Sequence, residues 1–214
     1  MTIPQLSTRS LARLSLLASV LALVLSLARG WSVPHAPMHT ALAAAPKTAL
    51  ADLFTTHDPT AARAYYLAQT PEDMTTYTHP VYGFSFPYFK DCTVAEIQDE
   101  QGELVLVENP AVGMGLQIFI TPDDAAEPLT LERIHRDLPD MPMEEEVEFT
   151  LPDGTAAVRF VSRDPVLGAV GETWFQRNGS LFQLSVLAPD RELQDAWLRE
   201  MASTLTFADD AGRP

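Results

Sequence analysis

The sequence predicts an α+β fold, in which an antiparallel β-sheet is flanked by helices as an α-β-α sandwich. Three observations lead to this fold class. Short segments in which apolar and polar residues alternate recur through residues 77–207 and are typical of half-buried strands. Turn sequences such as Gln101-Gly102 and Asn178-Gly179 separate several of these segments, as in β-hairpins. Two segments with helical periodicity, one internal and one near the end, complete the pattern.

Four strands are expected before the internal helix. In the first, Phe84, Phe86 and Tyr88 alternate along the chain and therefore point to one face. The other three are expected at residues 93–98, 103–108 and 116–121. The last of these is apolar and rich in β-branched residues, and it ends at Pro122.

The internal helix is expected between Thr130, a good N-cap residue, and Pro139, which ends it. Leu131, Ile134 and Leu138 fall on one face of this helix. The strands that follow are expected at residues 147–151, 156–160, 171–176 and 181–187. All four alternate or are apolar, so each is expected to bury one face at least.

The last helix is expected to start at Asp190, with Leu193, Ala196, Trp197 and Met201 on its apolar face. A closing strand is expected over residues 204–207. The two helices can then pack against a sheet built from the hairpins.

The N-terminus predicts export. Arg9 and Arg13 precede an uncharged, leucine-rich run at residues 14–28, which is the arrangement of a signal peptide. Ser26 and Ala28 are small residues that suit cleavage. An uncleaved anchor is the alternative, although a fifteen-residue helix spans roughly 22 Å, less than the ~30 Å hydrocarbon core. Residues 1–28 are therefore interpreted as a signal peptide or a membrane anchor helix.

The rest of the chain divides by composition. Residues 29–74 are rich in Ala, Pro and Thr and are interpreted as a linker, with a short helix expected at 60–68 and Thr60 as its cap. The α+β domain is assigned to residues 75–208 and a tail to 209–214.

Charge restricts the classes of partner. All 29 acidic residues lie after Arg29, against 11 basic ones, so the exported part carries a net charge of −18. Such a surface is repelled by nucleic acid and by anionic lipid head groups. Nucleic-acid binding is therefore not expected.

Several stretches resemble the PsbP-like family, which is named for an extrinsic subunit of photosystem II. The sequence Tyr-Gly-Phe-Ser-Phe-Pro-Tyr at residues 82–88 is similar to the opening strand of that family, although Phe89 follows where proline is usual. The Asn178-Gly179 hairpin, the Leu-Phe-Gln-Leu strand after it and the Trp197 helix before Ser-Thr-Leu-Thr-Phe look like its closing elements. Residues 115–134 resemble exported bacterial proteins of unknown function that share this fold.

The resemblance covers residues 77–207 and implies an α-β-α sandwich that is usually non-enzymatic and binds or assembles other proteins. From it we expect an exported, non-catalytic module that docks on or helps assemble an envelope or membrane protein complex, through a protein partner in the cell envelope. The alternative is an extracytoplasmic protein that binds a small ligand or calcium.

Catalytic signatures are not found in the sequence. It contains no HExxH, CxxC, GxSxG or P-loop motif. Cys92 is the single cysteine, so it cannot close an intrachain disulfide, and it is interpreted as a buried thiol rather than a nucleophile. Glu132 and His135 lie three residues apart on the expected helix, and a solvated surface is the preferred interpretation. The expectation is thus no enzyme, no catalytic residues and no cofactor.

Two sets of residues are candidates for binding. Carboxylates at Asp123, Asp124 and Glu127 form an acidic loop that offers oxygen ligands for calcium, although the spacing differs from an EF-hand. A candidate interaction surface consists of apolar residues in expected loops: Met141, Met143, Val166 and Leu167. The alternative for this surface is that its side chains cover the edge of the sheet.

Overall fold

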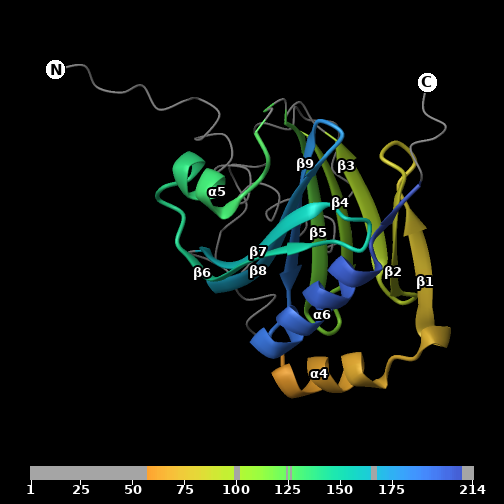
Figure 1. The fold of residues 1–214 in the computed structure, drawn as a ribbon. Coiled ribbons are helices and arrows are strands. Elements are labelled where there is room, and N and C mark those ends of the chain that lie inside the picture. Colours follow the sequence, from red (N-terminus) through yellow and green to blue (C-terminus); the bar gives the residue numbers. More distant parts are fainter. Residues whose placement is uncertain (1–56, 99–101, 124, 126, 165–167, 209–214) are drawn as a thin grey trace, which may run out of the picture.

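The computed structural model describes residues 57–98, 102–123, 125, 127–164 and 168–208. Within them, α-helices and antiparallel strands form the arrangement shown in Figure 1. The predicted signal or anchor segment, most of the predicted linker and the tail lie outside these residues. No helix in the described part has the length and hydropathy needed to cross a membrane.

The strands form two antiparallel sheets. The large sheet has the order β3-β4-β5-β9-β8-β7-β6. Its strands are β3 (Thr93–Gln98), β4 (Glu103–Asn109), β5 (Met114–Pro122), β6 (Met143–Thr150), β7 (Ala156–Asp164), β8 (Gly168–Arg177) and β9 (Ser180–Leu187). The small sheet has the order β1-β2-β10, with β1 (Met74–Thr78), β2 (Phe84–Phe89) and β10 (Thr206–Phe207).

The large sheet is made of two meanders, β3–β5 and β6–β9. They join where β5 pairs with β9, for example at Ile118 and Leu184. The connection between β5 and β6 contains α5 (Leu131–Asp137) and runs from the middle of the large sheet to its edge at β6. Asn178 and Gly179, both at positive φ (48° and 73°), form the predicted tight turn between β8 and β9.

One face of the large sheet packs against α6 (Arg191–Thr204) and the small sheet. We call it the α6 face. Ile118 on β5 and Leu184 on β9 are fully buried there, next to Phe84 of the small sheet and Trp197 of α6. Burial of a side chain of this size stabilises the fold by about 1.5–3 kcal/mol, so this cluster dominates the stability of the domain.

The opposite face, which we call the α5 face, holds a smaller cluster. Phe160 and Trp174 stand on β7 and β8 with their ring centroids 5.2 Å apart, and Ile134 and Leu138 of α5 pack over them. In Figure 1, α5 and α6 accordingly lie on opposite sides of strands β6–β8. The predicted helices on both faces of an antiparallel sheet are therefore present.

A helix within the predicted linker packs on the core. It is α4 (Pro59–Ala68), and Ala62 is completely buried. Tyr65 and Tyr66 contact the ring of Phe89 edge-on, with centroids 5.7 and 5.9 Å away. Part of the stretch assigned to the linker thus belongs to the folded body.

Several details differ from the predictions. The cap of α4 is Asp58, whose carboxylate accepts from the backbone N–H of Thr60, so Thr60 is not the cap. Helix α6 continues to Thr204, which shortens the closing strand to β10. The opening strand belongs to a separate small sheet, and β1 was not predicted. Alternation shows that a strand has a buried face, but it does not show which strand lies beside it.

Candidate functional site

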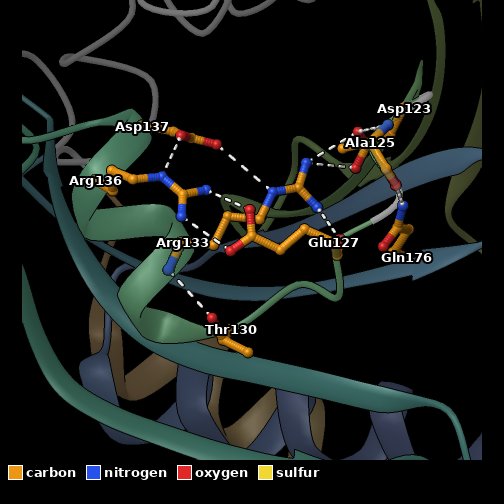
Figure 2. A network of polar contacts seen from close by, with 8 residues as sticks. All are labelled: Asp123, Ala125, Glu127, Thr130, Arg133, Arg136, Asp137 and Gln176. Carbon is orange, nitrogen blue, oxygen red and sulfur yellow. Dashed lines mark hydrogen bonds and ion pairs between the residues drawn. The ribbon is translucent and has the colours of Figure 1, made fainter.

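The acidic loop leads into α5 and is held by one buried arginine. Thr130 caps the helix by accepting from the backbone N–H of Arg133 at 3.1 Å. Arg133 is 4% exposed, and its Nη2 donates to both oxygens of Asp123 at 2.9 Å (Figure 2). Its Nη1 donates to the carbonyl oxygen of Glu127 at 2.9 Å. One guanidinium therefore fastens α5 to the end of β5.

A second arginine takes the remaining carboxylate of this loop. Arg136 donates from Nη1 and Nη2 to the two oxygens of Glu127, at 2.9 and 2.6 Å. These hydrogen bonds and the positive charge of Arg136 hold the pKa of the Glu127 carboxyl below its ordinary value. Figure 2 shows both arginines and both carboxylates in one connected network.

This geometry bears on the calcium hypothesis. Calcium needs several free oxygen ligands, whereas the oxygens of Asp123 and Glu127 already accept from guanidinium groups. Asp124 lies outside the described residues. Within the described part, no group of three or more His, Cys, Asp or Glu side chains is placed to hold a metal ion. The loop is better suited to fixing α5 than to binding a cation.

The candidate interaction surface is only partly described. Met141 and Met143 are half-buried and pack against the cluster on the α5 face. Val166 and Leu167 lie outside the described residues. The two methionines therefore help to cover the sheet and leave only part of their surface for another molecule.

The acidic run at the start of β6 serves to attach both helices. The register of β6 against β7 shifts between Glu144 and Val147, and Glu145 has a positive φ of 54°. This bulge sends neighbouring side chains in different directions. Glu145 consequently accepts from Arg191 of α6 at 2.8 Å, while Glu146 pairs with His135 of α5 at 2.9 Å.

Further along β6, Glu148 accepts from the backbone N–H of Leu131, the first residue of α5, at 2.9 Å. A negative charge at the N-terminus of a helix is favourable because the first backbone N–H groups have no partner within the helix. His135 pairs with Glu146 of β6, and Glu132 takes no part in this contact.

A buried carboxylate was missed by the sequence interpretation. Glu172 on β8 is 1% exposed, and its Oε2 accepts from Ser185 Oγ at 2.6 Å and from Trp174 Nε1 at 3.2 Å. Its Oε1 accepts from Ser162 Oγ at 3.1 Å. The signal was present, since Glu172 alternates in phase with Trp174 in a strand expected to be buried. The carboxylate links β7, β8 and β9 on the α5 face.

A buried histidine connects the two sheets. His79 is 1% exposed, and its Nδ1 accepts from the backbone N–H groups of Val81 and Tyr82, each at 3.2 Å. Its Nε2 lies 2.9 Å from Oε1 of Glu103. Because Nδ1 is an acceptor, Nε2 must carry the proton and donate it to the carboxylate. His79 thus holds the β1–β2 turn against β4.

Taken together, these contacts define an antiparallel α+β domain whose buried polar groups are used to join its elements. No family model matches the chain, and no curated protein matches it. Solved structures do match. The cyanobacterial PsbP (CyanoP) of Synechocystis superposes with a TM-score of 0.50 at 11% identity, over 66% of this chain and 96% of that one. The chain therefore has a PsbP-like fold.

Two further solved structures overlap less well. One is from Bacteroides thetaiotaomicron, with a TM-score of 0.39 at 15% identity, over 66% of this chain and 51% of that one. The other is a Pseudomonas aeruginosa protein of unknown function described as a putative regulator, with a TM-score of 0.35 at 14% identity, over 66% of this chain and 98% of that one. At these scores no conclusion about this chain rests on either.

Proposed function

We propose that this chain is an exported, non-catalytic module with a PsbP-like fold that docks on or helps assemble an envelope or membrane protein complex. The observation that carries the proposal is the match to cyanobacterial PsbP over nearly the whole of that protein. The PsbP-like family is named for an extrinsic subunit, which attaches to a membrane complex from outside. The proposal gives this chain a similar mode of action on a partner of its own.

Two features of the sequence support this proposal. The basic and leucine-rich N-terminal segment is suited to export, with either cleavage or retention as an anchor. The net charge of −18 after that segment disfavours direct contact with anionic lipids. A protein surface is then the more favourable partner for the exported body.

The arrangement of polar groups also favours a binding module. The buried carboxylates of Asp123 and Glu172 accept hydrogen bonds from neighbouring elements of the same domain. A catalytic acid or base has to be accessible to a substrate and within hydrogen-bond reach of it, and these two groups are enclosed. Their arrangement serves the rigidity of the domain.

The surface that we propose for docking is the connection between α5 and β6, around Met141 and Met143. Asp140 is exposed beside it and provides a position for a probe. Glu72 in the 3-10 turn Pro71–Asp73 is also exposed. This turn connects α4 to β1, and these two elements lie across the molecule from α5 in Figure 1. The two positions form a matched pair of exposed acidic residues.

The test is photo-cross-linking in cells that produce the full-length, tagged chain. A photoreactive amino acid replaces Asp140 in one variant and Glu72 in the other, and the adducts in the membrane fraction are identified by mass spectrometry. We expect one reproducible envelope-protein adduct from position 140 and none of that protein from position 72. Recovery of the chain without any adduct from either position would contradict the docking function. An adduct from position 72 alone would contradict the proposed surface.

A further inference from the structure

A hollow of about 280 Å³ lies on the α6 face, between α6 and the outer strands β6 and β7. Three arginines line it, Arg159 from β7 and Arg191 and Arg199 from α6, and we call it the arginine hollow. Gly171 of β8 also lines it. A Cβ atom at Gly171 would lie 3.3 Å from Leu198 and 3.7 Å from Nη1 of Arg191, so the absence of a side chain there lets α6 pack close to β8 beside the hollow.

Arg159 differs from the other arginines of the described part. Seven of them lie within 4 Å of a carboxylate oxygen: Arg63, Arg133, Arg136, Arg163, Arg177, Arg191 and Arg199. Arg159 is the eighth, and within the described residues it has no ion pair or hydrogen bond from its side chain. Acidic residues outnumber basic ones two to one in this chain (29 to 14), so an arginine without an acidic partner is unexpected.

Other donors beside Arg159 are also unused. Arg191 donates to Glu145 through Nη2, whereas its Nη1 is buried without a hydrogen-bond partner. Thr173 lies directly across from Arg159 in the β7–β8 register, and its buried hydroxyl has no partner either. Buried polar groups in folded proteins are almost always paired. The polar groups next to Arg159 are therefore not paired with one another within the described residues.

The acidic side chains that line the hollow each contact a partner other than Arg159. Glu145 pairs with Arg191, Glu146 pairs with His135, and Asp195 pairs with Arg199. Each of these carboxylates is therefore already engaged. The guanidinium of Arg159 is the group of this lining that has no direct acidic partner among the described residues.

We infer that the arginine hollow binds a small oxyanion, namely the carboxylate or phosphate group of a free solute, with Arg159 as the principal contact. A guanidinium presents a planar set of N–H donors that matches two oxygens of such a group. Arg191, whose Nη1 has no hydrogen-bond partner among the described residues, also lines the hollow. A free solute suits the site better than a lipid head group, because the strongly acidic body is repelled by an anionic membrane. This inference is independent of the docking function.

The test measures binding of inorganic phosphate and of succinate to the full-length chain, by calorimetry and by the arginine Nε–H resonances in ¹H–¹⁵N spectra. Sodium chloride keeps the ionic strength constant throughout. The main variant is Arg159→Gln. Its matched control is Arg163→Gln, because Arg163 lies four residues further along β7 on the same face, pairs with Glu144 and does not line the hollow.

A second pair of variants keeps the test valid if Arg159→Gln folds poorly. Val147 is 41% exposed and lies directly across from Arg159 in the β6–β7 register. Side chains at such paired positions have Cβ atoms about 4.5–5.5 Å apart. Val147→Glu therefore brings a carboxylate to Arg159 from within the protein and should compete with the ligand. Val147→Gln is its uncharged control.

We expect saturable binding of at least one of the two probes, weakened about ten-fold or more by Arg159→Gln and unchanged by Arg163→Gln. We also expect weaker binding in Val147→Glu and wild-type binding in Val147→Gln. The inference is overturned if neither probe binds saturably. Equal losses in the Arg159 and Arg163 variants, or in the two Val147 variants, would overturn it as well, since they would reflect general charge or local distortion.

Discussion

Removal of Arg133 should cost more stability than any other single change in the network of Figure 2. The side chains of Arg133 and Asp123 are 5% and 3% exposed. In Arg133→Met the Asp123 carboxylate keeps only the backbone N–H of Ala125, at 3.3 Å, and stays buried. Loss of one partner of a buried ion pair typically costs about 3–5 kcal/mol, because the remaining charge is not compensated.

The assay is urea unfolding of the full-length chain, followed by circular dichroism and tryptophan fluorescence. The matched control is Arg136→Met, three residues along the same helix, which breaks the exposed pair with Glu127. Exposed pairs contribute little because water already solvates both charges. We therefore expect a large fall of the urea midpoint for Arg133→Met and little or no change for Arg136→Met.

A double variant checks the cause. In Asp123→Asn with Arg133→Met neither buried charge is left without its partner, so the double variant should be more stable than the sum of the two single losses predicts. The reasoning is refuted if Arg133→Met and Arg136→Met lower the urea midpoint equally. Additive losses in the double variant would also refute it, because they would show that the two side chains act independently.

Four further predictions follow from the described contacts. Burial raises the pKa of the Cys92 thiol to about 12, so a thiol reagent should modify the native chain far more slowly than the urea-unfolded chain; equal rates would show an accessible thiol. Burial also raises the pKa of the half-buried Glu108 carboxyl, so its ionised form destabilises the fold at neutral pH and its neutral form does not in acid. Glu108→Gln should therefore raise the melting temperature near pH 7 but leave it unchanged in acid, and a gain at both pH values would point to another cause. Gly179→Val should cost about 1–2 kcal/mol in urea unfolding, because a branched side chain is strained at a φ of 73°; an unchanged midpoint would contradict that strain. Calcium should leave the melting temperature unchanged, because the carboxylates of Asp123 and Glu127 already accept from arginines; a saturable rise would support the calcium hypothesis instead.

Local patterns predicted most of the secondary structure well. Thr130 and Asp190 cap α5 and α6 as expected, because an N-cap depends only on a side chain and the backbone two or three residues ahead. The Asn178-Gly179 turn has both residues at positive φ for the same local reason. The cap of α4 was misplaced, since Asp58 and Thr60 are both good cap residues and only the backbone geometry distinguishes them.

The candidate sites were predicted less well than the elements. The acidic loop was identified as a group of carboxylates, but its partner Arg133 lies ten residues further along the chain and reaches it only because α5 folds back over the α5 face. In the acidic run at the start of β6, a bulge directs Glu145 to α6 and Glu146 to α5. Neither a bulge nor a helix position can be derived from charge spacing.

The sequence by itself determined most of the elements, several of their turns and caps, the resemblance to PsbP-like proteins and the acidic character of the chain after Arg29. These features depend on neighbouring residues and on composition. Only the tertiary structure decided that the strands form two sheets and that Arg159 lines a hollow beside α6. It also decided that the carboxylate of Glu172 is buried and accepts hydrogen bonds from two serines. The physical reason is the order of the large sheet. It pairs β5 with β9 and places β6 at the opposite edge from β3, so side chains that are far apart along the chain become neighbours.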